Sequence, residues 1–328
     1  MTPSNTCTRR ALIALASLAT TGFSAFPATA QDFPKQPIKI VIGFAPGGGN
    51  DIMGRVIAQK LSERLGQPAV VENRPGAGGI IAAEAVARAA PDGHTLLVAP
   101  IGTLVGNPAT YTKLPYDAQK SFAPIGMIAD FPLYLTVSAD HPAKNLKEII
   151  DWSKANKDKA NYASTSPLFQ VSLERFKQRT GATFEHIPFK SSGEMLTAVM
   201  TGQVTVALLD PPPLMGQIKS GKLRVLATSG AKRSTDLPDV PTFAEAGVEG
   251  MVVDAFTALV APAGTPAPVL AKLNAELNLA LKQPDVIERF KQLAVTPIGG
   301  TGESVSALLA REIPIWTDVA KKANIKLN

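Results

Sequence analysis

The sequence predicts an α/β protein of two lobes, each a mainly parallel sheet flanked by helices and hinged by two crossover segments. Apolar runs typical of buried strands alternate with apolar residues at helical spacing from residue 37 onward. The alternation occurs twice, over 37–100 and over 146–229, with unrelated residues. A chain of about 300 residues is long enough for two such units.

The first unit has the order strand, helix, strand, helix, strand. The segment PIKIVIGFA, 37–45, is a near-continuous apolar run, which is typical of a buried parallel strand. Apolar residues at helical spacing follow from Ile52 to Leu65, and Gly66 lies just past that helix. A strand at 69–73, the alanine-rich helix IIAAEAVARAA and a strand at 94–100 complete the unit. This order predicts parallel strands with helices on both faces.

The second unit repeats the pattern from the helical segment LKEIIDWSKAN to the segment LRVLATS, 223–229. We expect strands at 161–164, 183–189, 204–210 and 223–229, with helices between them. A further strand at 252–262 and long helices from Pro266 onward follow. Pro314 is expected to kink or break the last helix, because proline lacks the N–H that an interior turn needs.

Two long, extended-looking runs mark the expected lobe boundaries. They lie near residues 122–140 and 250–262, and we expect the hinge to pass through them. The first lobe then comprises 31–130 together with 252–328, and the second lobe comprises 131–251.

The N-terminus has the pattern of a secretory signal peptide. Arg9 and Arg10 precede a short apolar run that ends in PATA, and we expect cleavage after about Ala30. The mature protein is then exported, which fits a bacterial periplasm. The one cysteine, Cys7, precedes that site, so the mature chain has no disulfide, thiol nucleophile or cysteine metal ligand.

Charge and composition argue against several functional classes of protein. The formal net charge of +6 falls to +4 without residues 1–30, which carry two arginines and no acids. Basic residues are scattered and aromatic residues make up 6%, unlike a nucleic-acid binder. The three histidines lie far apart, so no metal or cofactor is predicted. No nucleophile has an evident base and orienting group, which argues against an enzyme that uses Asp51 or Asp210.

Five predicted strands end in loops rich in Gly, Ser, Thr or Asp, and most of these loops precede a helix. Helix N-termini present unpaired N–H groups and a partial positive charge, and glycine permits close approach to the backbone. We therefore expect a cleft that binds carboxylates without a fixed lysine or arginine. Each feature also has a plain structural explanation. The glycines and Asp210 suit turns, Asp51 suits a first helical turn, and 164–166 suit a helix cap.

Five segments taken together indicate a protein family more specifically than any one loop does. FAPGGGNDIMGR, ENRPGAGG, GQVTVALLD, SGAKRSTDLPDVPTFAEAG and APAGTP occur in this order. With them the chain resembles the substrate-binding proteins of tripartite tricarboxylate transporters, also called the Bug family, over almost all residues from Pro34 onward. The resemblance implies a type II-like periplasmic-binding-protein fold that closes on its ligand by a hinge.

The resemblance also implies ligand and partners. The expected ligand is a small carboxylate: a di- or tricarboxylate, an acidic amino acid or an aromatic acid. The expected partners are the membrane permease subunits of the transporter, with the receptor itself a monomer. A sensor that hands the same ligand to a signalling kinase is the alternative, and an exported hydrolase is a weaker one.

The family's ligand contacts transfer to fourteen positions in this chain. They are Ala45, Pro46, Gly47, Gly48, Asp51, Ile101, Gly102, Thr103, Ser164, Thr165, Ser166, Lys190, Ser191 and Asp210. TSPLFQVS stands where the family commonly has a glycine-rich stretch, so either a carboxylate subsite is changed or the ligand's distal end is apolar. The candidate apolar walls, for which core packing is the alternative role, are Phe44, Phe131, Phe169 and Phe189.

Overall fold

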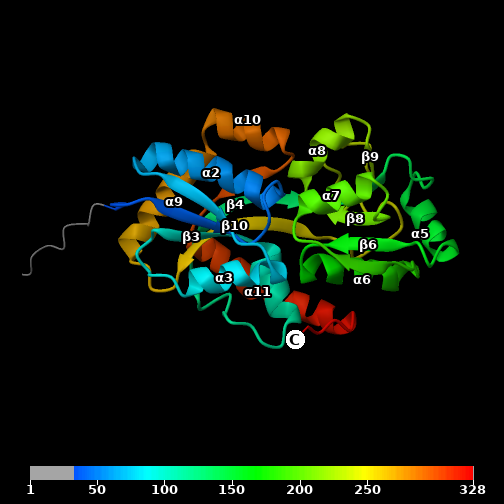
Figure 1. Ribbon diagram of the computed structural model, residues 1–328, viewed down its shortest axis with the longest axis horizontal. Coiled ribbons are helices and arrows are strands. Elements are labelled where there is room, and N and C mark those ends of the chain that lie inside the picture. Colours follow the sequence, from blue (N-terminus) through cyan, green and yellow to red (C-terminus); the bar gives the residue numbers. More distant parts are fainter. Residues whose placement is uncertain (1–32, 328) are drawn as a thin grey trace, which may run out of the picture. The chain divides into compact units, whose positions relative to one another are not determined.

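The computed structural model describes residues 33–327, and the predicted signal peptide lies outside the described residues (Figure 1). Two sheets with flanking helices form the fold, which confirms the two-lobed α/β class. Lobe 1 is the six-stranded sheet with its helices, and lobe 2 is the five-stranded sheet with its helices.

The sheet of lobe 1 has the strand order β11-β4-β10-β3-β1-β2. Its strands are β1 (Ile38–Ile42), β2 (Ala69–Asn73), β3 (Thr95–Pro100), β4 (Phe122–Pro132), β10 (Asp254–Pro262) and β11 (Thr296–Gly299). Strand β1 pairs in parallel with β2 and β3, as expected for the first unit. Strand β10 runs antiparallel to β3 and β4, and β11 runs antiparallel to β4.

The sheet of lobe 2 has the strand order β7-β6-β8-β5-β9. Its strands are β5 (Tyr134–Ser138), β6 (Asn161–Ser164), β7 (Glu185–Pro188), β8 (Val206–Leu209) and β9 (Leu223–Thr228). Strand β6 is parallel to β7 and β8, whereas β5 is antiparallel to β8 and β9.

Both sheets are mixed, so the prediction of mainly parallel sheets is wrong in this detail. The parallel strands are those of the two repeated units. The antiparallel pairs involve the strands that carry the chain between lobes and the strands beside them. Strand β4 leaves lobe 1 and β10 returns to it, and two neighbouring strands that leave and return must run in opposite directions.

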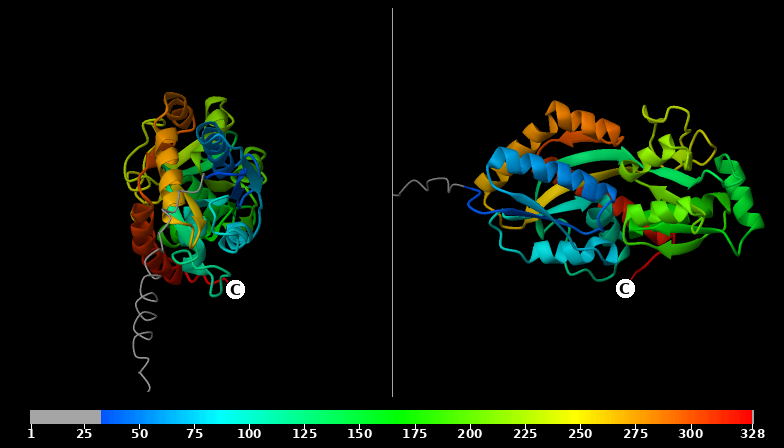
Figure 2. Two further views of the ribbon diagram at one scale, coloured as in Figure 1. Left: turned by 90° about the vertical axis from the view of Figure 1, so that its left-hand side faces the viewer. Right: turned by 45° about the horizontal axis from the view of Figure 1, so that its top comes forward.

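Helices cover both faces of each sheet (Figures 1 and 2). In lobe 1, α2 (Gly49–Leu65), α9 (Ala267–Leu281) and α10 (Pro284–Gln292) lie on one face, with α3 (Ile80–Ala87) and α11 (Gly302–Lys322) on the other. In lobe 2, α7 (Ser192–Met200) and α8 (Pro211–Lys219) lie opposite α6 (Pro167–Thr180), and α5 (Leu146–Ala155) precedes β6. Three short elements, η1 (Ala77–Gly79), η2 (Gly102–Gly106) and α4 (Asn107–Thr110), complete the described order.

Two helices show how the sequence determines these elements. Helix α2 buries Met53, Ile57 and Leu61 completely at four-residue spacing, and Gly66 ends it in the left-handed conformation at φ 69°. Helix α11 runs through Pro314 without ending, so of the expected kink or break the structure contradicts the break. One missing hydrogen bond does not end a 21-residue helix that packs along β4 and α4. Among residues 33–327, no helix is long and apolar enough to cross a membrane.

The chain crosses between the lobes at Leu133 and again between β9 and β10, and Ser229 connects the two crossings. Its N–H donates to the Leu133 carbonyl at 2.8 Å. Its hydroxyl accepts from the Leu133 N–H at 2.8 Å and donates to the Val253 carbonyl at 2.6 Å. Ser229 is buried, so these bonds form a water-excluded link at the expected hinge.

Candidate ligand-binding site

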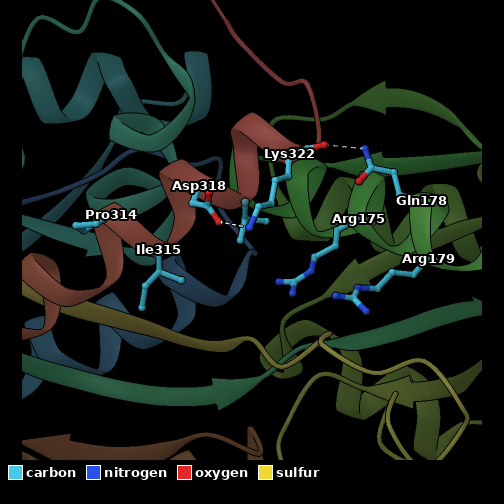
Figure 3. A pocket seen from close by; sticks show the side chains of 8 residues that line it. Arg175, Gln178, Arg179, Pro314, Ile315, Asp318 and Lys322 are labelled. Carbon is cyan, nitrogen blue, oxygen red and sulfur yellow. Dashed lines mark hydrogen bonds and ion pairs between the residues drawn. The ribbon is translucent and has the colours of Figure 1, made fainter.

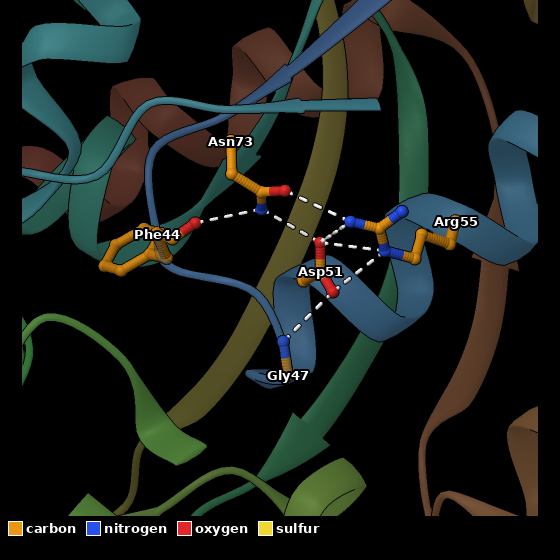
Figure 4. Close-up of polar contacts among 5 residues, drawn as sticks. All are labelled: Phe44, Gly47, Asp51, Arg55 and Asn73. Atoms are coloured by element: carbon orange, nitrogen blue, oxygen red, sulfur yellow. Dashed lines mark hydrogen bonds and ion pairs between the residues drawn. The ribbon is translucent and has the colours of Figure 1, made fainter. Parts of the chain in front are cut away.

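The side chain of Asp51 holds the glycine loop between β1 and α2 in place by hydrogen bonds (Figure 4). One carboxylate oxygen accepts from the Gly47 N–H at 3.1 Å, and both oxygens accept from Arg55 Nε at 3.0–3.1 Å. Asn73 Nδ2 donates to Asp51 at 2.9 Å and to the Phe44 carbonyl at 3.0 Å. The loop therefore has a defined shape, set by one carboxylate, one guanidinium and one amide.

Asp51 is held in its ionised form. Burial by itself raises the pKa of this carboxyl, but the hydrogen bonds from Arg55, Asn73 and Gly47 outweigh burial and lower it below its usual value. A carboxylate with both oxygens engaged in this way repels an anion and has no free donor. Asp51 is thus suited to shaping the loop.

Four helix N-termini meet at a pocket between the lobes, which we call the interlobe pocket. Lobe 1 contributes residues 48–50 at the start of α2, together with Ile101 and Gly102 after β3. Lobe 2 contributes the caps or first residues of α6, α7 and α8, which are Ser166, Ser192 and Asp210. N–H groups and helix dipoles at such N-termini attract anions without any cationic side chain.

Asp210 is the one charged side chain among the described lining residues. Burial raises the pKa of this carboxyl above its usual value, against hydrogen bonds from Ser192 and from the N–H groups of Asp210 and Gly49. Its Oδ1 has no hydrogen-bond partner among the described residues. Its Oδ2 lies 1.8 Å from the position that a Cβ on Gly49 would occupy. Asp210 therefore extends from lobe 2 against the N-terminus of α2 in lobe 1.

The remaining wall of the interlobe pocket is aromatic. Phe44, Phe131, Phe169 and Phe256 line it, and each is at most 9% exposed. Of the four candidate walls, Phe44, Phe131 and Phe169 line the pocket, whereas Phe189 does not. The pocket thus combines a polar side of helix N-termini with an apolar side of phenyl rings.

The two lobes are in close contact around this pocket. A Cβ on Gly102 would meet Ser166 Oγ at 2.8 Å, and one on Gly106 would meet Leu168 Cβ at 2.7 Å. The cavity left between them has a volume of about 20 Å³. By this measure it has room for about one water molecule. A small organic acid therefore needs the lobes to separate before it can enter.

The structure brings together some of the fourteen expected positions. Six of them line the interlobe pocket: Gly48, Ile101, Gly102, Thr165, Ser166 and Asp210. Eight do not line it: Ala45, Pro46, Gly47, Asp51, Thr103, Ser164, Lys190 and Ser191. In this conformation the eight residues do not line the interlobe pocket. They can affect a ligand there only by holding the lining residues in position.

Particular contacts direct several of these side chains away from the pocket. Ser164 Oγ is hydrogen-bonded to His186 Nε2 at 2.7 Å. Ser191 caps α7 by accepting the Glu194 N–H at 3.2 Å, and Lys190 is exposed. Thr103 Oγ1 faces the backbone of Gly79.

Sequence reasoning missed six lining residues, and four of them adjoin predicted ones. The six are Gly49, Asn50, Ser192, Pro100, Ala255 and Phe256. Gly49 and Asn50 continue the glycine loop, Pro100 precedes Ile101, and Ser192 follows Ser191, so these four are sequence neighbours of expected positions. Ala255 and Phe256 lie on the crossover strand β10, which carries no loop signal.

Comparison with known proteins places this geometry in context. Residues 53–325 match the model of the tripartite tricarboxylate transporter family receptor. Protein BugT of Bordetella pertussis is 36% identical over 313 residues, covering 94% of this chain and 96% of BugT.

Two solved structures from Rhodopseudomonas palustris are similar throughout. MatC with bound malate has a TM-score of 0.84 and 34% identity, over 88% of this chain and 99% of MatC. Rpa4515 with adipate has a TM-score of 0.86 and 31% identity, over 90% of this chain and 99% of Rpa4515.

Proposed function

Because the chain belongs to the tripartite tricarboxylate transporter receptor family, we propose that it captures a small carboxylate in the periplasm and presents it to a membrane permease of that transporter class. The malate bound to MatC and the adipate bound to Rpa4515 support a carboxylate as ligand. The observation that carries the proposal is the meeting of four helix N-termini at the interlobe pocket.

The proposed mode of binding relies on backbone N–H groups and hydroxyls. The described lining contains no lysine or arginine, and it offers the hydroxyls of Thr165, Ser166 and Ser192. Ser166 caps α6 without a side-chain capping bond, so its hydroxyl is not used by that helix. Charge-assisted hydrogen bonds contribute about 1.5–3 kcal/mol each. Two or three of them supply much of the roughly 8 kcal/mol of a micromolar site.

The lining favours an acid with an apolar body, such as an aromatic or medium-chain aliphatic acid. Four phenyl rings supply apolar surface for the distal end of the ligand. The one ionisable side chain of the described lining is acidic, so the lining has no cationic side chain to pair with a second or third carboxylate of a di- or tricarboxylate. Pro167 and Phe169 stand where a glycine-rich anion loop was expected from the family, which supports the same preference.

An exported hydrolase is the second candidate, because Ser164 and His186 form a pair that resembles a nucleophile and its base. Ser164 is 3% exposed and neither residue lines the interlobe pocket. Burial lowers the pKa of His186, and the nearby Glu174 opposes that shift without a hydrogen bond to the ring among the described residues. We therefore propose a binding role and no catalytic one.

Matched acids and amides test the proposal. Melting temperatures of the mature protein are measured with benzoate and benzamide, hexanoate and hexanamide, adipate, malate and citrate. A ligand at about 100 times its Kd adds about 2.7 kcal/mol of stability, a shift of several degrees. We expect the acids with apolar bodies to raise the melting temperature and their amides to have no effect.

Two results would contradict this account. Equal shifts with an acid and its amide would show that the carboxylate is not recognised. Larger shifts of the melting temperature with citrate or malate than with every apolar acid would still support a carboxylate receptor, but they would refute the preference for an apolar body.

Loss of ligand uptake in a strain lacking the permease, and not in one lacking a neighbouring sensor kinase, would separate transport from sensing.

A further inference from the structure

A second cavity lies between α6 of lobe 2 and α11 of lobe 1 (Figure 3). Its volume is about 710 Å³, within the 300–1,000 Å³ range of small-molecule sites. Arg175, Gln178 and Arg179 line it from α6. Pro314, Ile315, Asp318, Val319 and Lys322 line it from α11. It shares no lining residue with the interlobe pocket.

Two guanidinium groups from the lining of this cavity converge on Gly250, which is not itself a lining residue. Arg179 Nη2 lies 2.8 Å, and Arg175 Nη2 3.1 Å, from the position that a Cβ on Gly250 would occupy. Gly250 belongs to the segment that joins β9 to β10, and its φ of +70° favours a residue without a side chain. Gly250 thus leaves open the space into which both arginines extend.

Neither arginine is neutralised by the part of the chain that the structure describes. No ion pair or hydrogen bond joins Arg175 or Arg179 to a described acidic side chain. Asp318, the one carboxylate of the lining, is paired with Lys322 at 2.7 Å (Figure 3). Burial and the adjacent Arg179 lower the pKa of Arg175, as expected when a cation is half-buried beside a like charge.

We propose that Arg175 and Arg179 form a second anion site, which binds a carboxylate group of a small multivalent organic acid against the backbone of Gly250. Paired guanidinium groups provide forked donors that match carboxylate geometry. The site joins elements of both lobes and the segment between them, so its occupant bears on the relative position of the lobes. This role is separate from ligand capture in the interlobe pocket and does not depend on it.

Nuclear magnetic resonance of protein labelled with ¹⁵N-glycine tests the site directly, with citrate as the probe at constant ionic strength. We expect the Gly250 amide signal to shift saturably. In Arg175→Gln/Arg179→Gln the affinity reported by that signal should fall at least about tenfold. The matched variant Lys157→Gln/Lys159→Gln removes two exposed charges elsewhere and should keep the wild-type affinity.

The Gly250 signal separates this site from the interlobe pocket, which the Gly49 signal reports. A Gly250 signal that does not move, or that moves equally in the arginine variant, would overturn the proposal. So would a shift that grows linearly without saturation.

A second test needs no ligand. Asn and Asp both tolerate positive φ better than most residues and have nearly the same shape. Gly250→Asp places a carboxylate between the guanidinium groups, whereas Gly250→Asn does not, so the Asp variant should melt at the higher temperature. An Asp variant that melts at or below the Asn variant would contradict an anion-binding role for the two arginines.

Discussion

At the scale of single residues, Asp210 makes the stability of the protein depend on pH. Burial raises the pKa of its carboxyl in the folded state. Its contribution to the free energy of unfolding is therefore fully present below the unfolded pKa and is lost as pH rises through the raised pKa.

The variant Asp210→Asn removes this dependence and keeps the shape of the side chain. We expect it to be more stable than wild type at pH 7.5, on the order of 1–3 kcal/mol, because a buried charge with an unpaired oxygen is removed. The difference should shrink toward pH 4. Melting curves of both proteins over this range provide the measurement. A variant less stable than wild type at pH 7.5 would mean that the N-terminus of α2 binds the ionised form favourably.

Within the glycine loop, Gly49 is the residue that most directly limits closure of the two lobes. A Cβ there would meet Asp210 Oδ2 at 1.8 Å, whereas a Cβ on Gly216 in α8 meets nothing within 4 Å. Gly49→Ala should weaken binding of the best acid at least about tenfold by holding the lobes apart, and Gly216→Ala should leave affinity unchanged. Calorimetric titration of both variants is the test. Equal affinity in the two variants would show that contact between Gly49 and Asp210 is not needed for binding.

At the scale of elements, the loop before α2 is stabilised by the ion pair of Asp51 and Arg55 and by Asn73. The lowered pKa of Asp51 means that its contribution to stability is present above its unfolded pKa and is lost as pH falls through the folded one. Asp51→Asn should therefore cost about 1–3 kcal/mol at pH 7 and progressively less under acidic conditions. Urea denaturation of wild type and variant at two pH values measures this loss of stability. A loss that is the same at both pH values would exclude the ionised carboxylate as its cause.

Sequence patterns predicted some of these elements closely. Strands at 69–73 and 161–164 were predicted to the residue, because turn residues bound both segments, although no residue of the first strand is buried. They did not predict η2, the π-helical turn at Gly102–Gly106 that Ile101 precedes. They also failed in the direction of the crossover strands, since strand direction depends on topology and not on local pattern.

The candidate site was predictable to the level of loops only. Strand ends followed by Gly, Ser or Asp converge on one cleft because the carboxyl ends of parallel strands share one edge. Which residue of a loop faces that cleft depends on capping geometry: Ser191 is used to cap α7, and Ser192 therefore lines the pocket. The contribution of Phe256 could not be predicted, because it comes from a strand that crosses between lobes.

At the scale of the whole molecule, ligand capture requires two lobes that move about the crossovers. The division into 31–130 with 252–328, and 131–251, stays a prediction; in the structure the chain crosses at Leu133 and again between β9 and β10. Ser229 joins both crossings, so Ser229→Ala leaves the buried N–H of Leu133 without its acceptor and should cost about 1–3 kcal/mol. The matched change Ser306→Ala, on an exposed face of α11, should cost less than about 0.5 kcal/mol. Equal losses of stability in the two variants would refute a special role for Ser229.

The central claim is that the helix N-termini of both lobes hold one ligand carboxylate in the interlobe pocket. The most direct measurement is a crystal structure of the mature protein with the best-binding acid of the panel. We expect the carboxylate within hydrogen-bond distance of N–H groups in the first turns of α2 and α7, with the rest of the ligand against Phe169 and Phe256. A carboxylate bound by a lysine or arginine side chain, or lying outside this pocket, would contradict it.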